Sequence, residues 1–345
     1  MNEQPLDCTP LVSVCPITYN HVKHFSQAIE SILSQQVNFE LEIIVGEDES
    51  SDGTREIALE YQERFPDKFT VLLHSRKDVI YVNGRATGRW NFVDTLSHAN
   101  GKYIALLSCD DFWTDPHKLQ KQVDVMEAYP EYSVCGHWTV NVDENGDLLS
   151  SQPLTGKTCP EVFFIKHALN GTPLIPNSWL FRRFDLANHP QYPLFLKLPA
   201  GDDPLMLMLL GRGPGYCIRQ DMSAYRIHSG GTWSTKSQYH KDFEMLQFHI
   251  AAMQFAGWRY VPKALTIIHE SVFLLFADIV REVMNTRSLS PLMDLLKLVR
   301  IQKTVPIYFI VPLFIIGCIL LPVKLALRLG RMAVNRVRAM IGSVL

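Results

Sequence analysis

The sequence predicts an α/β fold: a Rossmann-like, mainly parallel sheet flanked by helices. From Leu11 to about Ala105, short apolar runs of strand length alternate with helix-length segments. Strands separated by helices of this length form βαβ units, whose strands are parallel. The composition agrees with a folded protein that has a sizeable core, because 47% of the 345 residues are hydrophobic and 20% are charged.

The elements follow one another in the order that such a sheet requires. Four apolar runs are predicted strands: Leu11–Ile17, Leu41–Val45, Phe69–Leu73 and Lys102–Leu107. Residues 21–36 place apolar side chains at helical spacing, and a second helix covers Thr54–Phe65 and ends near Pro66. Because ligands bind outside the carboxyl ends of parallel strands, the residues directly after each strand are the candidates for a site.

Acidic residues follow two of these strands. After the second comes the stretch Glu47–Thr54, of which Asp52-Gly53-Thr54 taken alone reads as a turn that caps the next helix. After the fourth comes Asp110-Asp111. Two adjacent carboxylates repel each other and lose hydration, and a divalent cation such as Mg²⁺ or Mn²⁺ compensates both effects. A helix cap before Pro116 is the structural alternative for this pair.

Two further polar clusters lie downstream. Asp202 and Asp203 precede an apolar run that reads as a buried helix, and Pro204 suits its first turn. Their functional interpretation is a general base aimed into a cleft from the helix N-terminus. The stretch Tyr225–Trp233 combines an Arg and a His with a Gly-Gly pair, which suits a phosphate-binding loop that can close over its ligand.

Taken in order, these pieces resemble family 2 glycosyltransferases of the GT-A fold. The matching segments run from about residue 11 to 233: Val12–Asn20 with Ala28–Gln35 (opening strand and helix), Glu47–Thr54 (nucleotide loop), Asp110–Trp113 (D-x-D-type metal motif), Gly201–Asp203 (later acidic pair) and Tyr225–His228 (closing loop). Two positions depart from the pattern, since Glu47 replaces the usual Asp and Glu49 the usual Gly.

The resemblance implies a role for each matching residue. Thr18 and Asp48 would contact the nucleotide base, and Asp110 would hold the ribose or the water shell of the metal. Asp111 would bind the Mg²⁺ or Mn²⁺ that bridges the diphosphate. The remaining implied site residues are Arg89 and Arg226 (nucleotide sugar), His228 (diphosphate or metal), Asp203 (catalytic base) and Asp202 beside it.

The activity that the resemblance implies is a metal-dependent, inverting transfer of a sugar from a nucleotide-diphosphate donor, by default a UDP-sugar. One carboxylate would accept the proton of the acceptor hydroxyl while the metal stabilises the leaving diphosphate. Two other classes stay open: a catalytically inactive, membrane-bound nucleotide-sugar-binding or scaffold protein, and a nucleotidyltransferase. A processive synthase is disfavoured because Gln254–Arg259 does not match Gln-x-x-Arg-Trp.

The C-terminal third differs from this domain, which we expect to cover residues 1–235. Residues 236–303 read as a helical extension. Val305–Val323 is a run of 19 uncharged residues, just long enough to cross about 30 Å of hydrocarbon. Basic residues on both sides disfavour a simple crossing, and a basic amphipathic helix follows.

We therefore expect residues 304–345 to form a monotopic or re-entrant anchor on an anionic membrane surface, at the cytoplasmic face of the inner membrane. A true span and a buried helical core are the alternatives. An anchor of this kind favours a lipid-linked or glycan acceptor in surface polysaccharide or glycolipid assembly.

Charge, cysteine content and the first ten residues argue against nucleic-acid binding, disulfides, a zinc site and a secretory signal. Lys+Arg 33 against Asp+Glu 35 gives a net charge of −2, so no global basic field is present to bind nucleic acid. The seven cysteines are scattered and odd in number, which fits a reducing compartment and supports neither a disulfide framework nor a zinc site. Met1–Pro10 has neither the basic nor the apolar region of a secretory signal.

Overall fold

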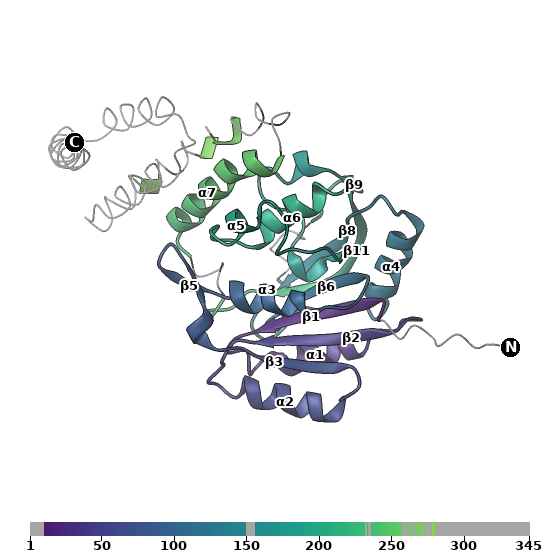
Figure 1. Cartoon of the computed structure of the whole chain (residues 1–345). Coiled ribbons are helices and arrows are strands. Elements are labelled where there is room, and N and C mark those ends of the chain that lie inside the picture. Colours follow the sequence, from purple (N-terminus) through teal and green to yellow (C-terminus); the bar gives the residue numbers. More distant parts are fainter. Residues whose placement is uncertain are drawn as a thin grey trace. The chain divides into compact units, whose positions relative to one another are not determined.

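The structure is a computed structural model that describes residues 10–149, 156–231, 233 and 236–256, with single positions between 260 and 279 (Figure 1). The chain divides into two compact units, Met1–Thr235 with Ala251–Tyr260 and Lys236–Ile250 with Val261–Leu345. The first unit contains every predicted site residue. In the C-terminal part, helix α7 covers Gln238–Ala256. None of the described helices is both long and apolar enough to cross a membrane, and the predicted anchor, residues 304–345, lies outside the described residues.

Nine of the described strands form one sheet, in the order β3-β2-β1-β6-β10-β8-β11-β7 with β9 paired to β11. Their bounds are β1 Val12–Thr18, β2 Leu41–Glu47, β3 Phe69–Leu73, β6 Tyr103–Ser108, β7 Phe112–Trp113, β8 Val134–Val142, β9 Val162–Phe163, β10 Leu180–Arg182 and β11 Gly215–Arg226. The half formed by β3, β2, β1 and β6 is parallel, which confirms the predicted α/β fold. In the other half β10 runs antiparallel to β6 and β8, whereas β8 and β11 are parallel.

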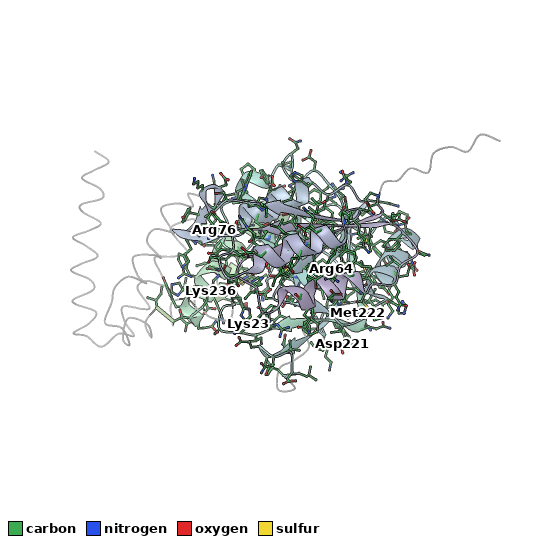
Figure 2. The ribbon with its side chains drawn as sticks, turned by 90° about the horizontal axis from the view of Figure 1, so that it is seen from below. Lys23, Arg64, Arg76, Asp221, Met222 and Lys236 are labelled. Atoms are coloured by element: carbon green, nitrogen blue, oxygen red, sulfur yellow. The ribbon has the colours of Figure 1, made fainter. Side chains whose placement is uncertain are left out.

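Helices cover both faces of this sheet. Their bounds are α1 Phe25–Leu33, α2 Thr54–Arg64, α3 Arg89–Ser97, α4 Lys118–Ala128, α5 Tyr192–Phe195 and α6 Asp202–Leu210, with short 3₁₀ turns at Arg76–Asp78, Ile165–His167 and Pro176–Ser178. Helices α1, α2 and α4 bury apolar side chains against alternate residues of β1, β2 and β6. Figure 2 looks onto α1 and α2 across this face. Helix α3 lies on the opposite face (Figure 1).

A small hairpin stands apart from the main sheet. Its strands are β4 (Ile80–Val82) and β5 (Arg85–Thr87), which pair antiparallel. The two connecting residues both have positive φ, 53° at Asn83 and 76° at Gly84, as a tight hairpin turn of the Asn-Gly kind requires. The hairpin leads directly into α3.

Helix α1 begins later than predicted, at Phe25 and not at His21. Two contacts with the loop after β2 explain the delay: the N–H of His21 donates to Oγ1 of Thr54 at 2.9 Å, and the N–H of Val22 donates to Oδ2 of Asp52 at 3.0 Å. Because these N–H groups serve the neighbouring loop, residues 21–24 form a turn that ties the ends of β1 and β2 together.

The carboxyl ends of the parallel strands meet at one edge, which brings the ends of β1, β2 and β6 into neighbouring positions. The chain then returns to this edge from far away. Immediately after Asp111, β7 pairs antiparallel with the end of β11, with Phe112 opposite Ala224. Tyr225 and Arg226, predicted to lie in a flexible loop, are therefore the last residues of a strand.

Candidate functional site

Asp110 lies among histidines. Its Oδ2 is 3.2 Å from Nε2 of His228 and 3.9 Å from Nε2 of His21. Burial pushes the pKa of Asp110 up, but the hydrogen bond with His228 and the nearby His21 outweigh it, so the pKa lies well below the usual value. The bond to Asp110 raises the pKa of His228. A third ring, that of His24, packs edge-on against His228 at 5.6 Å. Asp110 is thus held as a carboxylate beside an imidazole.

Asp111 has a different environment from its neighbour. Its side chain is only 5% exposed, Oδ1 accepts the N–H of Arg226 at 2.9 Å, and Oδ2 accepts Nδ2 of Asn177 at 3.0 Å. Burial and the charge of Asp110 raise its pKa well above the usual range. Asp111 and His228 are the predicted metal ligands. The structure places both oxygens of Asp111 against protein donors, whereas the carboxylate in contact with His228 is that of Asp110.

Arg226 holds this acidic pair in place. It is 3% exposed, and each of its three side-chain nitrogens donates to a protein acceptor. The acceptors are the carbonyls of Asp110, Asp143 and Glu144 and the Oε1 of Gln27, at 2.7 to 3.2 Å. These bonds fix the position of Asp110, and the contact of Arg226 with a nucleotide sugar stays a prediction.

The second acidic pair opens α6. Asp203 is 7% exposed, and its Oδ1 accepts the backbone N–H of Thr172 at 2.6 Å. Burial and the adjacent charge of Asp202 raise the pKa of Asp203 to about 7. A carboxylate with that pKa takes up a proton readily near neutral pH, which is the property of a general base.

Tyr225 shows that the two acidic pairs share one region. Its pKa is raised by burial first and then by the charges of Asp111, Asp110 and Asp202. The last residues of β11 therefore lie within electrostatic reach of the end of β6 and of the start of α6.

Asp48 lies at the end of β2 beneath an arginine. Its Oδ2 is paired with Nη1 of Arg76, whose guanidinium stacks over the ring of Tyr19 at 4.3 Å. Arg76, labelled in Figure 2, is partly exposed. Asp48 is only 2% exposed, and its Oδ1 is buried without a hydrogen-bond partner. Burial raises the pKa of Asp48 against the opposing effect of Arg76. Arg76 thus contacts both the carboxylate of Asp48 and the ring of Tyr19, beside the end of β2.

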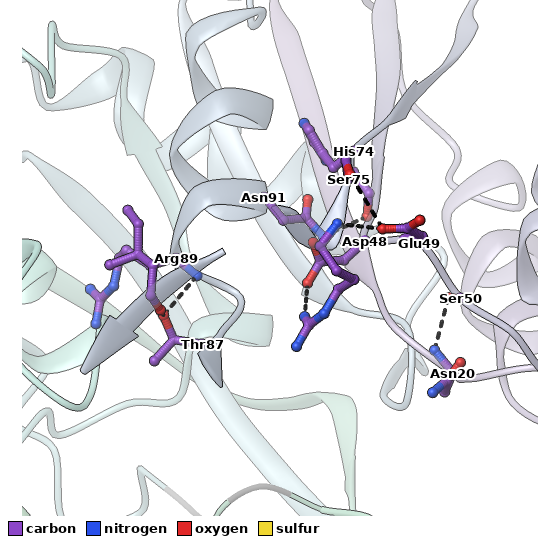
Figure 3. Close-up of polar contacts among 12 residues, drawn as sticks. Asn20, Asp48, Glu49, Ser50, His74, Ser75, Thr87, Arg89 and Asn91 are labelled. Carbon is purple, nitrogen blue, oxygen red and sulfur yellow. Dashed lines mark hydrogen bonds and ion pairs between the residues drawn. The ribbon is translucent and has the colours of Figure 1, made fainter. Parts of the chain in front are cut away.

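The two departures from the family pattern have structural reasons. Glu47 is completely buried, pairs with Arg55 and accepts the N–H of Ser50, so its carboxylate holds the loop together from inside. Glu49 has a φ of 59°, in the left-handed region where the family's usual glycine is at ease. Its carboxylate accepts hydrogen bonds from the N–H of Arg76 and the hydroxyl of Ser75 (Figure 3). Those bonds offset the backbone strain and hold Arg76 over Asp48.

Thr18 and Arg89, two further predicted residues, are both buried. Oγ1 of Thr18 lies 3.4 Å from Nδ1 of His21, close to Asp110. Nη2 of Arg89 donates to the carbonyl of Leu198 at 2.8 Å, and its guanidinium lies over the ring of Phe195 at 4.4 Å. Burial lowers the pKa of Arg89 to about 10, and Nη1 is buried without a partner. Arg89 thus lies inside the protein, in contact with the segment that leads into α6.

The donor set suits a hard divalent cation. Among the residues that the structure describes, no group of three His, Cys, Asp or Glu side chains is arranged to hold a metal ion. Asp110 and His228 offer two donors, and Mg²⁺ or Mn²⁺ commonly takes one or two protein ligands and completes its shell with phosphate oxygens and water. The residues present therefore fit an ion that is bound together with a diphosphate.

Several residues at this site carried no signal in the sequence. His21 and His24 lie in what reads as a helix, Arg76 and Asn177 in segments without a motif, and Thr172 contributes only its backbone. Their contribution depends on which side chains the fold brings together. The departure at Glu49 was the one usable clue, because a residue in place of glycine draws attention to a turn.

Comparison with known proteins agrees with the predicted family. Residues 13–186, just over half of the chain, match the family model described as Glycosyl transferase family 2. An uncharacterized protein of Mycobacterium tuberculosis is 30% identical over 230 residues, 64% of this chain and 60% of that protein. A Bacillus subtilis protein provisionally named as the teichuronic acid biosynthesis glycosyltransferase TuaG is 31% identical over 129 residues, 37% of this chain and 47% of its own. The chain thus spans about 60% of the length of the mycobacterial relative.

A solved structure supports the fold. The mannosyltransferase PcManGT of Pyrobaculum calidifontis, in complex with GDP-Man and Mn²⁺, superposes with a TM-score of 0.53 at 17% identity, over 84% of this chain and 79% of that one. The likeness confirms the expected GT-A-type fold. On the family match and the fold together, this chain belongs to glycosyl transferase family 2, as the sequence predicted.

Proposed function

We propose that this protein is a metal-dependent, inverting glycosyltransferase that moves a sugar from a nucleotide-diphosphate donor to an acceptor hydroxyl. One observation carries the proposal: the Asp110 carboxylate lies beside His228 just after β6, and Asp203, with a pKa raised to about 7, opens α6, whose first residue Asp202 acts with Asp110 on the pKa of Tyr225. The first suits a metal-bound diphosphate and the second suits proton removal. Inverting transfer needs both functions, on opposite sides of the sugar.

The donor side is assigned to the ends of β1, β2 and β6. Asp110 and His228 would hold Mg²⁺ or Mn²⁺, which in the loaded enzyme stabilises negative charge on the leaving diphosphate. Arg226 is a positioning residue in this proposal, because its bonds fix the backbone at Asp110. Asp48 and Thr18 are assigned to the nucleotide base, with Tyr19 and Arg76 beside Asp48 as a stacking surface. A UDP-sugar is the default donor.

The acceptor side is assigned to α6. The N–H of Thr172 fixes Oδ1 of Asp203, which leaves Oδ2 to take the proton of the acceptor hydroxyl as its oxygen bonds to the anomeric carbon. Burial and then the charge of Asp202 keep the pKa of Asp203 high, so that the base holds the abstracted proton at neutral pH. Arg89, whose guanidinium bonds to the carbonyl of Leu198 shortly before this helix, would act on the sugar end of the donor.

We further propose a lipid-linked or glycan acceptor in surface polysaccharide or glycolipid assembly, at an anionic membrane surface. The apolar run Val305–Val323 and the basic residues that follow it support this proposal. The name of the Bacillus subtilis relative, which refers to teichuronic acid biosynthesis, points in the same direction. The cytoplasmic face of the inner membrane is the expected location.

A thermal-shift panel of nucleotide sugars, with and without Mn²⁺, tests the proposal. We expect at least one nucleotide sugar to raise the Tm in a Mn²⁺-dependent manner and to be hydrolysed slowly in the absence of acceptor. Binding without hydrolysis or transfer would instead support an inactive scaffold. Release of pyrophosphate from a nucleoside triphosphate would support a nucleotidyltransferase. No shift with any donor would contradict the proposal.

A further inference from the structure

A buried asparagine joins the ends of the two strands that carry the proposed nucleotide contacts. Asn91, in the first turn of α3, is 3% exposed. Its Nδ2 donates to the carbonyl of Gly46 at 3.0 Å and lies 3.5 Å from the carbonyl of Thr18. Gly46 belongs to β2 and Thr18 to β1. Figure 3 shows the side chain of Asn91 beside Asp48. One amide group thus spans the carboxyl ends of two neighbouring parallel strands.

The orientation of this amide is fixed by its surroundings. Its Oδ1 accepts the hydroxyl of Thr95, one turn further along α3, at 3.2 Å. The opposite orientation would bring Oδ1 against two carbonyl oxygens, which are acceptors like itself. Asn91 is therefore a donor toward the sheet and an acceptor toward its own helix.

Gly46 permits this close approach. A Cβ at residue 46 would lie 1.9 Å from Oδ1 of Asn91 and 2.1 Å from Oγ1 of Thr95. Neither separation is compatible with a side chain at that position. The amide of Asn91 therefore fits between β2 and α3 only because residue 46 has no side chain.

The same strand ends hold the residues of the base site. The carbonyl of Thr18 also accepts the N–H of Asp48 at 3.1 Å, so the contact that Asn91 approaches is the one that places Asp48 beside β1. Asp48 follows Gly46 by only two residues, and Glu47 between them is fully buried. A shift of the backbone at Gly46, where Asn91 binds, would therefore also move Asp48.

We infer that Asn91 is a positioning residue for the nucleotide site: its amide holds the ends of β1 and β2 in the register that sets Asp48 against Thr18. This inference rests on the proposed function, which assigns the nucleotide base to those two residues. Asn91 itself acts through the backbone and touches no substrate.

Asn91→Asp tests the inference with least change of shape. The new oxygen replaces the donor and faces the carbonyls of Gly46 and Thr18. We expect the Kd for the nucleoside diphosphate that the wild-type protein binds best, among UDP, GDP and dTDP with Mn²⁺, to rise about ten-fold, with turnover at saturating donor reduced less than KM is raised. The amide hydrogen of Asp48 should also exchange faster.

Two further variants separate positioning from general stability. Val93→Ala shortens a buried apolar side chain on the same helix; it should lower the Tm and leave the nucleotide Kd unchanged. Thr95→Val keeps the side-chain volume but removes the hydroxyl that holds Oδ1 of Asn91. We expect it to raise the Kd about two- to three-fold, and it provides the test if Asn91→Asp does not fold.

The outcomes are distinct. Weaker nucleotide binding and faster exchange at Asp48 in the Asn91 and Thr95 variants, but not in Val93→Ala, support the inference. Unchanged Kd and exchange in Asn91→Asp and Thr95→Val, in a protein whose wild type binds nucleotide, overturn it alone. A wild-type protein that binds none of the nucleoside diphosphates overturns the proposed function and this inference with it.

Discussion

Asp111 and Arg226 face each other where β7 meets the end of β11, and the backbone N–H of Arg226 donates to Oδ1 of Asp111 at 2.9 Å. The two residues are 115 positions apart in the chain. Their contact turns Asp111 toward the interior, and the side chain of Asp110 then lies beside His228. The chemical difference between two adjacent carboxylates thus depends on one antiparallel strand pair.

Arg226→Lys should destabilise the protein and disturb the site together. A lysine keeps the positive charge but cannot reproduce the bonds that the guanidinium makes to Asp110, Gln27 and the 143–144 turn. We expect a loss of about 2–4 kcal/mol in the free energy of unfolding, measured in urea. Arg219→Lys, an exposed position on the same strand, is the control and should stay within about 0.5 kcal/mol of wild type. Equal stability of both variants would refute the positioning role.

Transfer activity should depend on pH through Asp203. A general base acts in its ionised form, and the pKa of Asp203 is raised to about 7 by burial and by Asp202. The rate at saturating donor should therefore rise between about pH 6 and 8 and then level off. Asp202→Asn removes the neighbouring negative charge, so ionisation of Asp203 becomes easier and the rising limb should move to lower pH. A limb that stays in place or moves to higher pH would show that another group controls the profile.

Asp203→Asn should abolish transfer, preserve nucleotide binding and raise stability at high pH. The amide oxygen can still accept the N–H of Thr172. Because the pKa is higher in the folded protein than in an unfolded chain, ionisation of Asp203 costs stability progressively above about pH 4, and the full cost is reached above about pH 7. The Tm advantage of the variant should thus be largest near pH 8 and vanish near pH 4. Wild-type transfer rates in this variant would exclude Asp203 as the base.

Removal of residues 304–345 should release the protein from membranes. That segment contains Val305–Val323 and the basic positions after it, and burial of apolar area plus attraction to anionic lipid is what binds such a segment. The full chain should sediment with vesicles that contain anionic lipid, and the shortened chain should remain in the supernatant while it still binds donor. A shortened chain that sediments as well as the full chain would disprove the anchor.

The parallel half of the sheet could be predicted because β1 and β6 and most of β2 are buried, and all four strands appear as short, mostly apolar runs. β1, β2, β3 and β6 all lie within two residues of their expected bounds. The other half could not be predicted in this way. β7 has two residues and β10 has three, too few for a period to be recognised, and they exist because distant strands pair with them.

The functional site, like the sheet, has a part that the sequence predicts and a part that it does not. Its carboxylates could be found because charged residues directly after apolar runs are conspicuous. The division of labour between Asp110 and Asp111 could not, because it depends on the direction of each side chain, which the pairing of β7 with β11 decides. Arg76 reaches Asp48 through a turn held by Glu49. No local sequence pattern predicts such a contact between residues that are far apart in the chain.

The most direct test of the account is calorimetric titration of the best-bound nucleoside diphosphate, with and without Mn²⁺, into the wild type and two variants. Asp110→Asn removes the carboxylate beside His228, so the Mn²⁺-dependent gain in affinity should disappear. Asp111→Asn keeps an oxygen that can accept the N–H of Arg226, so most of that gain should remain in the folded protein. A gain that survives in Asp110→Asn and is lost in Asp111→Asn would contradict the assignment of the metal to Asp110.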